Sequence, residues 1–184
     1  MADIYDIIIV GAGPAGMTAS IYAVRANMKT LLLDRLAPGG QMVKTNEVEN
    51  YPGAGKLSGA DLAIKMFEHT QELGVEFDYK TVIDIQDGDL KTVVCEEDGA
   101  TYRARAVILA TGTVPRRLNV PGENTWAANG ISWCAICDGA QYRGKEVVVI
   151  GGGNSAVEES IYLAGICTKV TIVTMFDHTA DPKA

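Results

Sequence analysis

The stretch that decides the fold is 5-YDIIIVGAGPAGMTASIYAVRANMKTLLLDR-35, in which an apolar, β-branched run leads into a glycine-rich turn. Small and apolar residues with helical spacing follow, and then a second apolar run that ends at Asp34. Strand, helix and parallel strand in this order form a βαβ unit. A second copy of this plan stands at 145-KEVVVIGGGNSAVEESIYLAGICTKVTIVT-174. Its turn begins at Gly151, 140 positions after Gly11 (151 − 11), so we expect two separate nucleotide-binding domains rather than a repeat array.

The first glycine turn has the pattern of a dinucleotide-binding loop. Gly11 permits the tight turn, Gly13 lets the backbone touch a pyrophosphate, and Gly16 lets helix and strand pack closely. The pyrophosphate then rests at the positive end of the helix. Asp34 follows Gly16 by 18 positions (34 − 16), close to where an acid binds ribose hydroxyls. The pattern predicts a bound dinucleotide, and the alternative is a glycine-rich turn without a ligand.

The second turn reads Gly151-x-Gly153-x-x-Ala156, with alanine as a permitted third residue. Its second strand ends at Thr174, so no acid stands at the strand end. An arginine for a 2'-phosphate is also missing from residues 174–184. A βαβ unit that keeps its turn but binds its nucleotide weakly, or not at all, remains an alternative.

The chain between the two βαβ units changes pattern. Residues 58–74 have helical spacing from Ser58 to a stop at Gly74. The apolar face of this helix is expected to carry Leu62, Phe67 and Leu73. The residues that follow alternate as antiparallel strands, with Asp87-Gly88 and Asp98-Gly99 as turn signals. An inserted β-meander is the simplest interpretation.

Composition and charge exclude several functional classes. The 184 residues are 47% hydrophobic and 21% charged, as in a globular protein with a core. A net charge of -7 argues against nucleic acid as a partner, because that surface needs a basic stripe. The apolar run from Ile7 to Val10 is too short for a membrane span, and MADIYD lacks a secretory signal's positive charge, so we expect a cytoplasmic protein. Cys95 and Cys167 stand in apolar runs and are expected to be small buried hydrophobes.

The remaining two cysteines form a Cys-x-x-Cys pair, Cys134 and Cys137. This spacing at a helix start can lower the pKa of a thiol and so favour the reactive thiolate. Asp138 follows directly and could supply or accept a proton during exchange. A structural zinc site would need four ligands, yet the chain has no second such pair and only His69 and His178. An inert buried pair is the other alternative.

Several motifs resemble, in the right order, those of one enzyme family, the low-molecular-weight thioredoxin reductases. They are GAGPAG at 11–16, GGQ at 39–41, EVENYPG at 47–53, ILATG at 108–112, CAICDG at 134–139 and GGGNSAVEE at 151–159. The resemblance covers nearly the whole chain. It implies an FAD-containing homodimer that passes electrons from NADPH to thioredoxin, with one domain rotating so that the dithiol alternates between flavin and thioredoxin.

The resemblance also implies roles for individual residues, none of them a metal ligand. Those expected to hold FAD are Gly11, Gly13, Pro14, Ala15, Gly16, Asp34, Gly40, Gln41, Asn50, Val82, Ala110, Thr111 and Gly112. Those expected to hold the pyridine nucleotide are Gly151, Gly153, Asn154, Ser155 and Ala156. Cys137 is expected to receive electrons from the flavin, Cys134 to exchange with the partner disulfide, and Asp138 to donate a proton.

The chain departs from the family pattern in two places. Family members grip the 2'-phosphate of NADPH with a His-Arg-Arg cluster and a later arginine, but Thr174, Met175 and Phe176 stand here. Losing several charge-assisted hydrogen bonds of about 1.5–3 kcal/mol each would remove most preference for NADPH. NADH, or another donor such as a ferredoxin, becomes an alternative. The chain also ends at Ala184, within the nucleotide domain, so we expect a fragment of a longer chain.

These observations predict an α/β fold with two Rossmann-like dinucleotide-binding domains, both incomplete. Residues 1–114 are expected to form the FAD-binding domain with its inserted meander, and residues 115–184 a truncated NAD(P)-binding domain with the dithiol. We predict a thioredoxin reductase in which electrons pass from NADPH or NADH through FAD and the dithiol to thioredoxin or a thioredoxin-like protein. The alternatives are a ferredoxin-fed or peroxidase-serving reductase, and a binding fragment without turnover.

Overall fold

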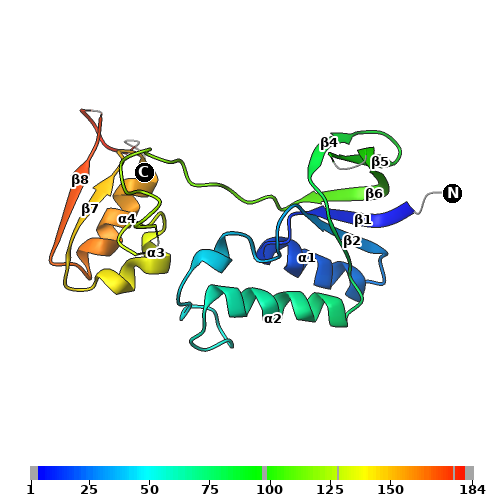
Figure 1. Cartoon of the computed structure of the whole chain (residues 1–184), viewed down its shortest axis with the longest axis horizontal. Helices are drawn as coiled ribbons and strands as arrows, with labels where there is room; N and C mark the ends of the chain where they lie inside the picture. Colours follow the sequence, from blue (N-terminus) through cyan, green and yellow to red (C-terminus); the bar gives the residue numbers. More distant parts are fainter. Residues whose placement is uncertain (1–3, 97–98, 128, 176, 181–184) are drawn as a thin grey trace. The chain divides into compact units, whose positions relative to one another are not determined.

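A computed structural model describes residues 4–96, 99–127, 129–175 and 177–180 of the chain. The chain divides into two compact units, Met1–Val114 and Pro115–Ala184, called unit 1 and unit 2 below (Figure 1). Within the described residues, no helix has the length and apolar character needed to cross a membrane.

Unit 1 is built on four parallel strands. In the order of the sheet they are β3 (Glu76–Tyr79), β2 (Thr30–Asp34), β1 (Ile4–Val10) and β6 (Thr101–Leu109). The continuous apolar run of β1 is explained by burial on both faces, as expected of a central parallel strand. Ile8 and Ile9 are fully buried in two different core clusters, and each such side chain contributes about 1.5–3 kcal/mol. The predicted α/β class is confirmed.

Helices α1 (Pro14–Arg25) and α2 (Gly59–Glu72) cover one face of this sheet (Figure 1). Ser58 caps α2 by accepting a hydrogen bond from the Asp61 backbone N–H at 3.0 Å. The predicted helix start is therefore confirmed, and so is the stop at Gly74, which has a φ of 83°. Leu62 is buried and Phe67 packs against the same core, as expected.

The prediction for Leu73 is wrong. This side chain is 36% exposed, and Leu73 is the C-cap of α2, one residue past the helix end at Glu72. The inward face of α2 is instead formed by residues at helical spacing, Leu62, Ala63, Met66, Phe67 and Thr70.

The predicted meander covers the other face of the sheet. β4 (Val82–Gln86) pairs antiparallel with β5 (Lys91–Cys95), and β5 pairs antiparallel with the beginning of β6 (Figure 1). β6 therefore belongs both to the meander and to the parallel sheet. Cys95 is buried in the core between these layers, as expected. The layers of unit 1 are thus meander, parallel sheet and helices.

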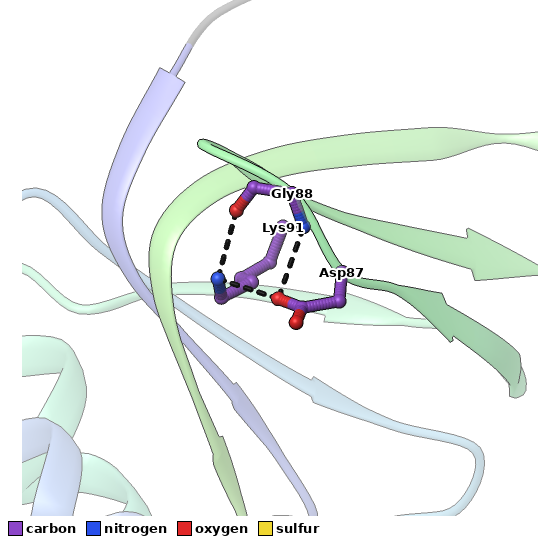
Figure 2. Close-up of polar contacts among 3 residues, drawn as sticks. All are labelled: Asp87, Gly88 and Lys91. Carbon is purple, nitrogen blue, oxygen red and sulfur yellow. Dashed lines mark hydrogen bonds and ion pairs between the residues drawn. The ribbon is translucent and has the colours of Figure 1, made fainter.

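Polar contacts hold the turn between β4 and β5 (Figure 2). The Asp87 carboxylate accepts the Gly88 backbone N–H at 3.0 Å and lies 2.6 Å from the Lys91 ammonium, which also donates to the Gly88 carbonyl at 2.8 Å. The hydrogen bond from Lys91 and then that from Gly88 lower the pKa of Asp87. The turn predicted here is present as a four-residue connection, whereas Asp98 of the second turn signal lies outside the described residues.

Two tyrosine hydroxyls of unit 1 donate hydrogen bonds to carboxylates of β3. The Tyr102 hydroxyl donates to Asp78 at 2.7 Å, and the Tyr5 hydroxyl donates to Glu76 at 2.8 Å. Burial raises the pKa of Tyr102 above its ordinary value, and the hydrogen bond to the Asp78 carboxylate raises it further. Neutral Tyr102 therefore stabilises the fold.

Unit 2 contains one βαβ unit and a short helical segment before it. The βαβ unit consists of β7 (Glu146–Ile150), α4 (Asn154–Ala164) and β8 (Lys169–Val173), with the two strands paired in parallel. α3 (Ala135–Asp138) and the 3-10 turn η3 (Gly139–Tyr142) precede it. Cys167 after α4 is only half-buried and its thiol donates to the Tyr142 carbonyl at 3.3 Å, so the prediction of a buried hydrophobe is wrong for Cys167.

Candidate functional site

The glycine turn of unit 1 is closed by backbone contacts that leave no room for side chains at two positions. Gly11 has a φ of 108°, and a Cβ on it would lie 2.3 Å from the Ala110 carbonyl oxygen. A Cβ on Gly16 would lie 1.8 Å from the Gly11 carbonyl oxygen. Gly16 thus lets α1 approach the end of β1, which is the packing role expected for it.

Gly13 differs from the other two glycines, because a Cβ on it would meet no atom of the described residues within 4 Å. It is the N-cap of α1, with extended backbone, and no side chain in the described part of the chain caps this helix end. Pro14 is the first helical residue, Ala15 is exposed, and the first turn of α1 carries no acidic residue. The open space beside Gly13 and the positive end of α1 together fit a pyrophosphate.

Asp34 ends β2 beside this turn. Its Oδ2 accepts a hydrogen bond from the Ala12 backbone N–H at 2.7 Å, and its Oδ1 accepts one from the Leu36 N–H at 2.9 Å. A carboxylate has about four acceptor positions, so these two bonds from described residues leave room for hydroxyl donors such as those of a ribose. The structure thus fixes the orientation of Asp34 next to the glycine turn.

The rim of the glycine turn is formed by two further segments of unit 1. A Cβ on Gly40, the first residue of η1 (Gly40–Lys44), would lie 3.3 Å from Gly13 Cα. The Gln41 side-chain amide donates to the Thr113 carbonyl at 3.1 Å and so ties η1 to the segment after β6. That segment begins with Ala110, whose N–H donates to the Val10 carbonyl at 2.8 Å. It continues with two exposed residues, Thr111 and Gly112.

Two predicted residues, Val82 and Asn50, belong to other segments of unit 1. Val82 begins β4, and Lys80 just before it donates its N–H to the Asp34 carbonyl at 3.0 Å. Val82 therefore lies near the end of β2, on the Asp34 side of the turn. Asn50 is exposed in the loop between η1 and α2 that the bridge between Val48 and Leu57 closes.

The glycine turn of unit 2 has the same construction. Gly151 has a φ of 144°, and a Cβ on it would lie 3.2 Å from the Ala156 methyl, so alanine fits as the third residue. Gly153 is the N-cap of α4, and a Cβ on it would meet no atom within 4 Å. Asn154 and Ser155 are exposed in the first turn of α4, which carries no acidic residue.

Backbone register shows which residue of unit 2 corresponds to Asp34. The Gly11 N–H donates to the Leu33 carbonyl at 2.7 Å, and the Gly151 N–H donates to the Val173 carbonyl at 2.9 Å. Thr174 therefore occupies the position of Asp34. A Cβ on Gly152 would lie 2.3 Å from Thr174 Oγ1, so this hydroxyl lies against the turn.

The segment that follows Thr174 returns to the glycine turn of unit 2. The Ala180 N–H donates to the Gly152 carbonyl at 2.7 Å. Met175 is 94% exposed, and His178 lies 2.9 Å from the Asp177 carboxylate. Phe176, one of the three residues that replace the basic cluster, lies outside the described residues.

Cys134 and Cys137 are joined by a disulfide. Cys134 is the N-cap of α3, and its Sγ accepts a hydrogen bond from the Cys137 backbone N–H at 3.2 Å. Cys137 is exposed and Cys134 is half-buried, which contradicts the alternative of a buried, inert pair. Among the described residues, no group of three or more His, Cys, Asp and Glu side chains is placed to hold a metal ion.

Ser132 is a residue of this site that sequence reasoning missed. Its hydroxyl donates to Asp138 Oδ2 and accepts the Cys134 backbone N–H at 3.1 Å. The available signal was a hydroxyl residue close to both the first cysteine and the acid. Only the folded chain brings Ser132 onto Asp138, because Cys134 has extended backbone and α3 begins directly after it.

Comparisons with known proteins agree with this geometry. Residues 5–184 match the family model described as pyridine nucleotide-disulphide oxidoreductase. The chain is 51% identical over 170 residues to the thioredoxin reductase of Bacillus subtilis (strain 168), a match that covers 92% of this chain and 54% of that protein. The chain thus spans about half the length of the curated relatives it matches.

Solved structures give the same result. The thioredoxin reductase from Streptococcus pyogenes MGAS5005 matches with a TM-score of 0.89 and 46% identity, covering 98% of this chain and 59% of that one. The thioredoxin reductase from Giardia duodenalis matches with a TM-score of 0.91 and 39% identity over the same shares, 98% and 59%.

Proposed function

Because the chain belongs to the pyridine nucleotide-disulphide oxidoreductase family, we propose that the protein is a flavin-dependent disulfide reductase. Electrons pass from a pyridine nucleotide through FAD and the Cys134–Cys137 pair to thioredoxin or a thioredoxin-like protein. The observation that carries this proposal is an accessible disulfide in a chain with two dinucleotide-binding turns. Curated relatives with about 50% sequence identity to this chain are named thioredoxin reductase.

The cradle of unit 1 fits FAD. The backbone N–H groups at the start of α1 would hold the pyrophosphate beside Gly13, and Asp34 would accept the ribose hydroxyls. Gly40 and Gln41 line the rim of the same cradle, where a side chain at position 40 would approach the turn. Bound FAD supplies the two-electron chemistry that links a nicotinamide to a disulfide.

The dithiol carries out thiol–disulfide exchange. One reduced sulfur attacks the partner disulfide as a thiolate, and the other then displaces it from the mixed disulfide. We assign the first step to Cys134 and the electron-accepting position to Cys137, with Asp138 as the proton donor. Serine variants of both residues test this order.

For the electron donor, we favour NADH over NADPH. The residue at the ribose position of unit 2 is the neutral Thr174, whose hydroxyl can accept and donate hydrogen bonds. A 2'-phosphate there would find no arginine between Thr174 and Ala184. Flavin reduction measured with each nucleotide checks this choice, and a strong preference for NADPH would contradict it. Reduction by neither nucleotide would favour another donor, such as a ferredoxin.

The decisive experiment measures donor-dependent reduction of thioredoxin by the complete natural protein. Cys134→Ser should abolish this activity and leave direct reduction of the flavin largely unchanged. Cys167→Ser is the matched control, because it removes a free thiol of the same unit. Thioredoxin reduction that survives Cys134→Ser would refute the proposal. A homodimer in the cytoplasm is part of the same proposal, and light scattering tests the dimer.

A further inference from the structure

We propose that Ser132 is a positioning residue that holds Asp138 ready for proton transfer during disulfide exchange, a role that rests on the function proposed for the dithiol. The Ser132 hydroxyl donates to Asp138 Oδ2 and accepts the Cys134 N–H at 3.1 Å. The Asp138 N–H donates to the Cys134 carbonyl at 3.0 Å. One hydroxyl therefore links the carboxylate to the backbone of the first redox cysteine.

A hydroxyl suits this position because it serves Asp138 in both protonation states. An ionised carboxylate only accepts hydrogen bonds, whereas a neutral carboxyl also donates one. In the ionised state the Ser132 O–H donates to Asp138 Oδ2. In the neutral state Asp138 donates to Ser132 Oγ, and the Ser132 O–H turns to the Cys134 carbonyl, 3.3 Å away.

The Cys134 N–H bond to Ser132 Oγ is kept in both arrangements. Asp138 can therefore gain or lose a proton without leaving the serine unpaired. Alanine at this position would offer neither bond, whereas threonine has the same donor and acceptor capacity.

The proton balance of the exchange requires such a group. Attack by the Cys134 sulfur forms a bond to one sulfur of the substrate disulfide and breaks the substrate S–S bond. The leaving sulfur takes the electron pair of that bond and then a proton. Cys137 next attacks Cys134 and releases the second substrate thiol. Two electrons and two protons thus leave the dithiol, and Asp138 takes each proton from an attacking thiol and returns it to a leaving sulfur.

A purely structural role for Ser132 makes different predictions. The N-cap of α3 is Cys134 rather than Ser132, so loss of the serine hydroxyl leaves the helix cap in place. If Ser132 acts through Asp138, its removal has no further effect once Asp138 can no longer transfer a proton. If Ser132 merely stabilises the turn, the two changes act independently.

The test follows exchange between the dithiothreitol-reduced complete protein and bis(2-hydroxyethyl) disulfide, from pH 5 to 9. Samples are quenched with N-ethylmaleimide, and mass spectrometry counts the alkylated thiols that remain. The variants are Ser132→Ala, Ser132→Thr, Asp138→Asn and the double variant with Ser132→Ala. Ser160→Ala is the control, because its buried hydroxyl donates within α4, to the Ala156 carbonyl at 2.6 Å. Circular dichroism verifies the fold of each variant.

We expect Ser132→Ala to slow exchange about tenfold near neutral pH and to flatten the pH dependence of the rate. A tenfold loss is a part of the roughly 10²–10⁴-fold rate increase that a well-placed acid–base group contributes. Threonine should restore the rate to within about twofold. In the Asp138→Asn protein, Ser132→Ala should change the rate by less than about twofold. An unchanged rate in Ser132→Ala, a tenfold loss that persists in the Asp138→Asn background, or no rescue by threonine would each overturn the proposal.

The assay needs neither flavin nor thioredoxin. Failure of the proposed reductase function would leave this exchange intact and stop only the donor-dependent reduction of thioredoxin. The two proposals therefore fail in distinguishable ways.

Discussion

Replacing Gly13 by alanine separates ligand binding from folding at the glycine turn of unit 1. The backbone there is extended, with a φ of −73° and a ψ of 179°, which alanine adopts without strain. The new methyl would meet no protein atom within 4 Å. Lower chain entropy in the unfolded state stabilises the variant by about 0.4–1 kcal/mol, and alanine is a poorer N-cap by a similar amount. The free energy of unfolding should therefore change by less than about 1 kcal/mol.

The same methyl would occupy the space through which the pyrophosphate of FAD reaches the backbone. Losing two charge-assisted hydrogen bonds of about 1.5–3 kcal/mol each costs about 3–6 kcal/mol. Since about 1.4 kcal/mol corresponds to a factor of ten, the Kd for FAD should rise by roughly 10²–10⁴-fold.

Titration of the apoprotein with FAD and denaturant unfolding measure the two effects separately. Gly16→Ala is the contrasting variant, because its Cβ would lie 1.8 Å from the Gly11 carbonyl oxygen and must displace backbone. We expect Gly16→Ala to destabilise the fold by about 1–3 kcal/mol or more. A folded Gly13→Ala protein that binds FAD within tenfold of the natural one would refute this account of the turn.

Three further changes test other parts of the structure. Tyr102→Phe should cost about 1–2 kcal/mol near neutral pH, because the hydroxyl donates to Asp78. The folded protein loses stability above a pH of about 10, because Tyr102 ionises more easily in the unfolded chain than in the folded one, where its pKa is raised. Tyr102→Phe should lessen this loss, and denaturant unfolding of both proteins at neutral pH and above pH 10 checks it. Asp87→Asn should remove the small contribution to stability of the exposed carboxylate that Lys91 stabilises. This contribution is present at neutral pH and is lost as the pH falls through the lowered pKa of Asp87. Melting curves of both proteins, measured from neutral into acidic pH, check this. Met175→Arg, at a side chain that is 94% exposed, should shift the ratio of flavin reduction rates about tenfold toward NADPH.

Periodicity and glycine spacing predicted the fold class, because they report which faces are buried and where the backbone must turn. The β1 run, the turn from Gly11 to Gly16 and Asp34 all follow from local rules. The exposure of Leu73 could not be predicted from spacing alone, since it depends on where α2 ends. The double use of β6 was also hidden, because strand pairing partners are not a local property.

The candidate site shows the same division between local and tertiary information. The Cys-x-x-Cys pair and Asp138 could be found from their spacing, which is local chemistry. The contact of Ser132 with Asp138 could not be found from spacing, because it depends on where α3 begins. The correspondence of Thr174 with Asp34 became visible only through the hydrogen-bond register of the two glycine turns.

The central claim is that the Cys134–Cys137 pair exchanges electrons with bound flavin. The most direct measurement is an anaerobic reductive titration of the complete holoprotein, with the number of electrons taken up per chain counted from flavin absorbance. The account predicts that the natural protein accepts roughly two electrons more per chain than a protein with serine at both positions, since a disulfide is a two-electron couple. Equal electron uptake by the two proteins would contradict it.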